Sequence, residues 1–404
     1  MFRILYIISL VLMMIGRFGV YKLNYFFQLS IGIVWIVIWM INRIAGTKIL
    51  KIDKIVVKYI VPWLLIGLWS GIIWSLNPPD VFDASYIGRM VSNLTLVAVA
   101  IINAYIGVYF FGKDIIYVAY TALLSCIAVN FVLVVPQYGF NLVIDYLFGV
   151  LVTDFQYGSI IWQLSYDLEV QGVTMALGMF LCYFLIADDI PQKRKIKLIL
   201  VSIPFLYIGF KRTVVLGVLI ALCLNFLISF KKINFKQLIY VASFIFCIIA
   251  ISYIVIIKTD FLEVVVTVLG IDTLGRTRIY SQVSQFFDLS PFYMGVGFCY
   301  IGKYLYESIG FAAHSEILRM YTEIGFIPFI AWIIYYLMYM PEYVYNKFGK
   351  NYGKVCLIVS VYVYSTYLVE NTLVSTPMLY GYAVFCFIGL SNKFQKKQEY
   401  PQID

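Results

Sequence analysis

Long apolar runs recur along this chain from end to end, separated by short polar or basic segments. A hydrocarbon core of about 30 Å is crossed by roughly 20 apolar residues in a helix. The runs are continuous and do not alternate with polar residues, so they predict helices and argue against a β-barrel. About twelve transmembrane helices follow from this pattern. They span residues 4–15, 25–41, 55–74, 90–111, 115–135, 173–187, 196–210, 214–230, 238–257, 324–340, 355–369 and 373–390.

Two longer polar segments interrupt this series, at residues 137–169 and 258–321. The second is the larger and lies between the ninth and tenth predicted helices. The predicted fold class is therefore all-α: a polytopic integral membrane protein with a single membrane domain, residues 1–404, and a large external loop. The N-terminal run resembles a signal peptide, but no small-residue cleavage site follows it, so we expect a retained first helix.

Composition supports the membrane assignment. Of the 404 residues, 63% are hydrophobic and 13% are charged, and the mean hydropathy is +0.91, which is far above that of a soluble domain. A net charge of +9 could indicate a nucleic-acid partner. The basic residues, however, form short clusters between apolar runs, where they set membrane topology, so no nucleic acid is expected.

The charges also predict an orientation. With the N-terminus in the cytoplasm, about two thirds of the 30 Lys and Arg residues are cytoplasmic and about two thirds of the 21 acidic residues are external. The positive-inside rule then places both termini in the cytoplasm and both polar segments outside the plasma membrane. Nucleotide sugars and ATP are not supplied there, so a reaction would need a donor that arrives already activated.

The seven cysteines show neither a disulfide framework nor the spacing of metal ligands. All but Cys299 fall inside predicted helices. The chain also has no glycine-rich nucleotide loop. We therefore expect no metal and no cofactor.

Lys211 and Arg212 fall in a tight external turn between two apolar runs. A charge placed there is costly unless it meets a partner, which favours a functional reading. The alternative is that both side chains extend to the interface without a role. Arg212 is the better candidate for phosphate binding, because lysine lacks the planar fork of a guanidinium.

Arg276 and Arg278 lie early in the large loop, two residues apart. On an extended segment they share a face, but on a helix they diverge, so at most one then points into a site. We favour Arg276, because Gly275 permits close approach of the backbone to an anion. Solvated loop charges are the alternative reading for both.

His314 is the single histidine, and it precedes Ser315 and Glu316. Ser315 is a plausible N-cap of a helix with Glu316 in its first turn, which places His314 just before that helix. Histidine suits a general base outside the cell, since its ordinary pKa of about 6.5 leaves it mostly neutral. The alternative is an ordinary loop histidine.

Secondary candidates lie nearby in the sequence or on the same predicted side. Glu316 and Glu323 are rivals of His314 for the role of base, although a carboxylate would repel a diphosphate. Arg89, with Asp80 and Asp83, occupies another external loop and is a further candidate for substrate contact.

Four short motifs follow one another in the second half of the chain. An arginine precedes a leucine by four residues, a Gly-Arg pair opens the large loop, and a Gly-x-Gly precedes the histidine. The histidine is followed by serine, nine further residues and a glycine. These motifs are Arg212 to Leu216, Gly275-Arg276, Gly295-Val296-Gly297 and His314-Ser315 to Gly325.

In order, spacing and predicted membrane side, these motifs resemble those of the bacterial O-antigen ligase and O-antigen polymerase (Wzy-type) superfamily. The likeness covers residues 212–328, and the first half of the chain is similar only in hydropathy. Pro328 stands where the family has a final glycine. This departure weakens the match without touching the expected chemistry.

The resemblance implies a metal-independent, inverting glycosyltransferase in the bacterial plasma (inner) membrane. Its donor would be a glycan on undecaprenyl pyrophosphate. Arg212 and Arg276 would hold the diphosphate, with Arg278 and Lys211 as further candidates. His314 would take the proton from the attacking hydroxyl of the acceptor, with Ser315 beside it.

The leading expectation is a repeat-unit polymerase of an O antigen or capsule. A ligase that transfers the finished chain to lipid A core is the nearest rival, and the shared residues do not separate the two. A cell-wall glycan polymerase is disfavoured, because its catalytic acidic residue has no clear counterpart. A lipid-linked oligosaccharide flippase is also possible, but transporters commonly show two related halves. A chain-length regulator and a flippase are the partners that the resemblance implies.

Overall fold

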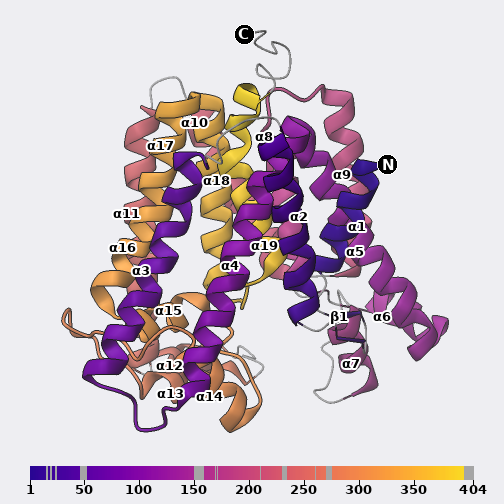
Figure 1. Cartoon of the computed structure of the whole chain (residues 1–404). Coiled ribbons are helices and arrows are strands. Elements are labelled where there is room, and N and C mark those ends of the chain that lie inside the picture. The colour runs from indigo at the N-terminus through magenta and orange to yellow at the C-terminus, as the bar shows by residue number, and fades with distance from the viewer. Residues whose placement is uncertain are drawn as a thin grey trace.

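The computed structural model describes residues 1–14, 17–18, 21–22, 25–45, 52–149, 159–168, 170, 172–209, 211–229, 234–259, 261–269 and 275–394. Within these ranges the regular secondary structure is helical apart from one pair of two-residue antiparallel strands, β1 (Arg17–Phe18) and β2 (Tyr21–Lys22). Figure 1 shows long helices side by side in one bundle. The all-α prediction is confirmed.

The first half of the described chain contains nine α-helices and one 3₁₀ turn. They are α1 (Phe2–Met14), α2 (Tyr25–Ala45), α3 (Lys54–Leu76), α4 (Ala84–Phe111), η1 (Gly112–Asp114), α5 (Ile115–Tyr138), α6 (Phe140–Gly149), α7 (Ile160–Leu168), α8 (Val173–Ile186) and α9 (Gln192–Ile208).

The second half contains the remaining helices, including one π-helical turn, η2. They are α10 (Arg212–Ser229), α11 (Phe235–Lys258), α12 (Phe261–Leu269), α13 (Arg276–Ser284), α14 (Tyr300–Ile309), α15 (Glu316–Ile324), α16 (Phe326–Ile334), η2 (Tyr335–Tyr339), α17 (Met340–Phe348), α18 (Lys350–Tyr367), α19 (Thr376–Phe387) and η3 (Ile388–Leu390).

Six helical stretches in the described part of the chain are long and apolar enough to cross a membrane, or seven if the bent pair α7 and α8 forms one span. They indicate a membrane-embedded protein. The stretches are Phe26–Ala45, Lys54–Leu76, Ala84–Tyr138, Arg212–Ser229, Phe235–Lys258 and Phe326–Phe348. The 55-residue stretch comprises α4 and α5, with η1 between them.

Several predicted spans are shorter helices than their apolar runs suggested. α8 has 14 residues and α19 has 12, against roughly 20 for a full crossing. α19 is nevertheless buried along its whole length, and it packs against α4, α8 and α18 in the centre of the bundle. Its apolar character therefore reflects burial in the protein core and not contact with lipid.

Several tyrosine hydroxyls inside the bundle are hydrogen-bonded to the backbone of other helices. Tyr6 donates a hydrogen bond to the carbonyl of Asn103 at 2.9 Å and lies 3.1 Å from the hydroxyl of Tyr380. Tyr362 donates to the carbonyl of Met175 at 2.7 Å. A buried hydroxyl without a partner is costly in such a setting, so these bonds fix how α1, α8, α18 and α19 pack.

The bundle has two chemically different ends. At one, which we call the Asp189 end, four ion pairs join segments far apart in the sequence. They are Arg3 with Asp114, Lys113 with Asp189, Lys354 with Asp188, and Lys393 with Asp53. At the other, the His314 end, α12, α13 and α14 lie together at the bottom of Figure 1.

Three glycines of the sequence motifs fix the backbone at the His314 end. Gly295, Gly297 and Gly325 all have positive φ, at 95°, 96° and 79°. The amide of Gly297 donates to the carbonyl of Glu323 at 2.7 Å. A Cβ on Gly325 would collide with the carbonyl oxygen of Tyr293. These glycines thus allow residues 293–298 to lie against the end of α15.

Candidate functional site

His314 occupies a strained position immediately before α15. Its φ is +51°, a conformation uncommon for a residue with a side chain. Ser315 is the N-cap of α15, and its Oγ accepts a hydrogen bond from the amide of Leu318 at 3.2 Å, so the predicted cap is confirmed. The carbonyl of His314 accepts from the hydroxyl of Tyr280 at 3.3 Å. Its Nδ1 lies 3.4 Å from Nδ2 of Asn371.

The two arginines of the large loop take different directions. Gly275 has a φ of +78° and caps α13, which begins at Arg276. Because the segment is helical, Arg276 and Arg278 diverge. Arg276 is half-buried and is a hydrogen-bonding partner of the Tyr280 hydroxyl. Arg278 is exposed, so Arg276 is the member of the pair that lies beside His314.

Tyr280 connects α13 to the segment around His314. Its ring lies 6.3 Å from that of Tyr253 on α11 in an edge arrangement, and the Tyr253 hydroxyl also bonds to Ser315. Burial raises the pKa of Tyr280, because the phenolate would lose its hydration. The hydroxyl therefore stays protonated at neutral pH and serves as a donor.

A second cationic group enters the site at the start of α10. Nζ of Lys211 lies 3.9 Å from Oε1 of Glu370, and the hydroxyl of Thr213 donates to the same oxygen at 3.0 Å. Glu370 is only 8% exposed. Arg212 is exposed, and its guanidinium has no ion pair or hydrogen bond with the part of the chain that the structure describes.

The turn between α18 and α19 brings these groups together. Its consecutive residues Glu370 and Asn371 contact Lys211 and His314, respectively, and Glu370 also interacts electrostatically with Tyr280. Three predicted site residues from separate regions of the sequence are therefore linked: Tyr280 joins Arg276 to His314, and the turn residues Glu370 and Asn371 join Lys211 to His314. Two cationic groups and a candidate base thus belong to one cluster of polar side chains.

Sequence reasoning missed Glu370 and Asn371, along with Tyr280. One signal was available, because Glu370 is the only charged residue between Lys354 and Lys393. An isolated ionisable residue in so long an apolar region is a functional candidate by default. Asn371 and Tyr280 carry no comparable signal.

The carboxylates of Glu316 and Glu323, the alternative candidates for the base, both interact with other groups of the protein. Oε1 of Glu316 accepts from the amide of Leu373 at 2.9 Å, and Oε2 pairs with Arg319 at 2.9 Å. Oε2 of Glu323 lies 3.6 Å from Nε of Arg319. Burial raises the pKa of Glu316, and it raises the pKa of Glu323 to about 7 against the opposing effect of Arg319. Neither carboxylate is accessible to a substrate, since both residues are fully buried.

Arg89 lies apart from His314. It is exposed on α4 and interacts with Cys299, whose thiol accepts from Nδ2 of Asn93 at 3.0 Å. Burial raises the pKa of Cys299 to about 12, so its thiol remains protonated. Arg89 and Cys299 are near α14, and no described contact joins either to His314.

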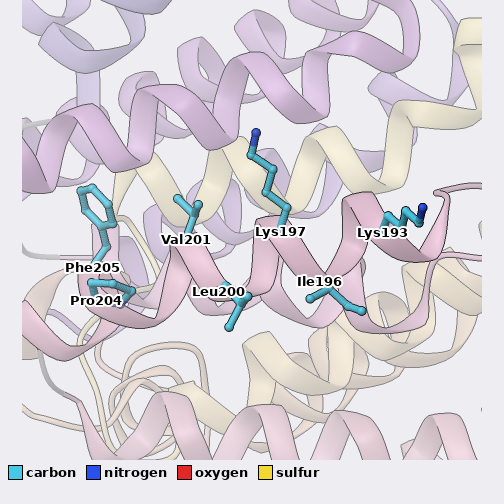
Figure 2. Close-up of a pocket in the computed structure, with 7 residues that line it drawn as sticks. All are labelled: Lys193, Ile196, Lys197, Leu200, Val201, Pro204 and Phe205. Carbon is cyan, nitrogen blue, oxygen red and sulfur yellow. The ribbon is translucent and has the colours of Figure 1, made fainter.

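The groove in Figure 2 is separate from this cluster. It has a volume of about 530 Å³, and all the residues that line it, from Lys193 to Phe205, belong to α9. Among the described residues, no group of three or more His, Cys, Asp or Glu could hold a metal ion. No protein-family model matches the chain, and no curated protein matches it in sequence.

Proposed function

We propose that this protein is a repeat-unit polymerase of a bacterial surface polysaccharide, an O antigen or a capsule. It transfers a glycan from undecaprenyl pyrophosphate to a lipid-linked acceptor repeat on the outer face of the plasma membrane. The observation that supports this most is the convergence of Lys211, Arg276 and His314 around Tyr280, Glu370 and Asn371. The order of the sequence motifs adds to it.

In the proposed reaction, a hydroxyl oxygen of the acceptor sugar attacks the anomeric carbon of the donor. The bond from that carbon to the diphosphate breaks, and the configuration inverts. His314 takes the hydroxyl proton, a contribution of roughly 10² to 10⁴ in rate. Arg276 stabilises the charge that develops on the leaving diphosphate. Removal of one such group typically lowers kcat by a factor of about 10² to 10³. Arg212 and Lys211 contribute further positive charge.

The proposal includes a topology of about twelve spans with both termini in the cytoplasm. The Asp189 end is then cytoplasmic, and the His314 end is external. Ion pairs at the Asp189 end link the two terminal segments and four connections, all of which the positive-inside rule assigns to the cytoplasm. The cluster at one end of the bundle also favours transfer over flipping, since transporter sites commonly lie near the midplane.

The test is the polymer ladder of a strain that lacks the gene and is complemented with variants. We expect His314→Ala to give single repeats on the final acceptor, as the empty vector does. Arg276→Ala should shorten or abolish the ladder. Arg278→Ala is the matched control, because it removes the same charge from an exposed position on the same helix. Normal chains from His314→Ala would refute the proposal.

The same ladder separates the polymerase from a ligase. A missing polymerase leaves one repeat on the final acceptor. A missing ligase leaves long chains on the lipid carrier, with none on the acceptor. The second pattern would assign the same site to ligation.

A further inference from the structure

We infer that Asn371 is a positioning residue that sets the orientation and the tautomer of His314, so that Nε2 is the atom that receives the proton. This inference rests on the proposed function for its chemistry, but the contact itself does not. The side-chain amide of Asn371 lies 3.4 Å from Nδ1 of His314. The atom of an imidazole that carries the proton is set by the hydrogen bond at its other nitrogen.

The turn that carries Asn371 is anchored on both sides. On one side, Oε1 of Glu370 accepts from the hydroxyl of Thr213 at 3.0 Å. On the other, the amide of Leu373 donates to Oε1 of Glu316 at 2.9 Å. These anchors attach the turn to α10 and to α15. Asn371 therefore has little freedom to move away from His314.

The histidine is held as firmly. Tyr280 donates to its carbonyl, and Ser315 begins α15 directly after it. With both backbones fixed, the remaining freedom is rotation of the imidazole and of the amide. Asn371 contributes a contact to Nδ1 of the imidazole.

We assign the amide of Asn371 the orientation in which Oδ1, and not Nδ2, faces Nδ1 of His314. The nitrogen and oxygen of an asparagine side chain are nearly isosteric, and a half-turn about its last bond exchanges them. Oδ1 of Asn371 is buried and has no hydrogen-bond partner among the described residues. After the half-turn, Oδ1 accepts a hydrogen bond from Nδ1–H of His314. The lone pair then lies on Nε2, and the bond at Nδ1 persists once Nε2 is protonated.

The single histidine makes the tautomer directly measurable. Full-length protein with ¹⁵N-labelled histidine, carrying an affinity tag without histidine, is placed in lipid nanodiscs and studied by NMR. We expect the neutral wild-type imidazole to carry its proton on Nδ1. In Asn371→Ala the proton should move to Nε2. Asn392→Ala is the control, because Asn392 is exposed and bonds to Tyr352 far from His314; it should leave the tautomer unchanged.

A pH titration of the same signals gives the second readout. Asn371→Asp places a carboxylate beside Nδ1–H, which favours the imidazolium and should raise the midpoint by about 1 pH unit or more. The acidic limb of kcat/KM should move with it. Elements packed around His314 carry other charged or titratable groups that both proteins share. These are Lys211, Tyr253, Arg276, Tyr280, Glu316, Arg319 and Glu370.

The inference is wrong if wild type carries its proton on Nε2, or if neither substitution at Asn371 changes the tautomer or the midpoint. Because NMR needs no turnover, this result is distinct from failure of the proposed function. That failure would appear as normal polymer from His314→Ala, whatever the tautomer. A purely structural role for Asn371 would lower thermal stability and leave both NMR readouts at their wild-type values.

Discussion

The two ends of the bundle use charge differently. In each of the four ion pairs at the Asp189 end, at least one side chain is about half exposed or more. At the His314 end, the side chains of Glu316, Arg319 and Glu323 are 1%, 11% and 0% exposed. Exposed pairs contribute about 0–1 kcal/mol each, whereas a buried pair broken on one side costs several times more. Exposed pairs of this kind also occur at the His314 end, at Lys258 and Lys303. The difference between the ends is therefore the buried group Glu316, Arg319 and Glu323, which tolerates loss of a partner far less than the exposed pairs do.

Buried charge of this kind is not an efficient way to stabilise a fold. Well-packed apolar residues often do as well or better, because two charges must first lose their hydration. Glu316, Arg319 and Glu323, which we call the α15 triad, also contain two carboxylates and only one cation. The position of the triad suggests a structural role, since Glu316 links α15 to the turn that carries Asn371. We interpret the triad as the support of the site around His314.

The largest expected effect is on stability, from Arg319→Met. It leaves two buried carboxylates without a cation and should lower the free energy of unfolding by about 3–5 kcal/mol. Lys393→Gln, at the Asp189 end, should change it by less than about 1 kcal/mol. Chemical unfolding of the detergent-solubilised variants measures both. Equal effects at the two ends would remove the contrast on which this account is built.

The substitutions Gly325→Ala and Gly349→Ala test backbone packing at the His314 end and the Asp189 end, respectively. Both glycines have positive φ, at 79° and 97°, but only at Gly325 would a Cβ meet backbone atoms. Each substitution should cost about 1–3 kcal/mol, because the ψ angles of 176° and 174° place both residues in a backbone region that is essentially restricted to glycine. Gly325→Ala should cost a further 1–3 kcal/mol or so for overpacking. The same unfolding assay applies, and a Gly349 variant as unstable as the Gly325 variant would contradict the packing argument.

A smaller change in the free energy of unfolding is expected when the pH is varied. The pKa of Glu323 is raised from 4.5 to about 7 by burial, so the folded protein holds a proton that the unfolded chain has lost between these values. Stability from this group is complete below pH 4.5 and is lost as the pH rises through 7. Glu323→Gln should flatten that decline by about 2–3 kcal/mol. A wild-type curve that is flat over this range would show that the carboxylate stays charged.

Local rules predicted much of the site, and long-range packing decided the rest. The cap at Ser315 and the divergence of Arg276 from Arg278 follow from short-range geometry, and both are observed. The triad of α15 was not recognised as buried, because residues spaced by three and four on a helix also suit a solvated face. Its burial comes from contact with α3 and α14, which no local pattern reveals.

The helix lengths show the same limit. The apolar run at residues 373–390 predicted one long span, whereas α19 has 12 residues and begins only at Thr376. The preceding residues form the turn whose amide at Leu373 binds Glu316. Hydropathy registers burial in protein and burial in lipid alike. It therefore concealed Asn371 between two predicted helices.

The most direct test of the central claim is polymerisation by the purified protein in nanodiscs, supplied with lipid-diphosphate-linked repeats from the deletion strain. We expect wild type to join repeats and to release one undecaprenyl diphosphate for each bond formed, with chelator present. His314→Ala should be slower by roughly 10² to 10⁴. A variant as fast as wild type, or a wild type that forms no bond, would contradict the assignment of the His314 end as the active site.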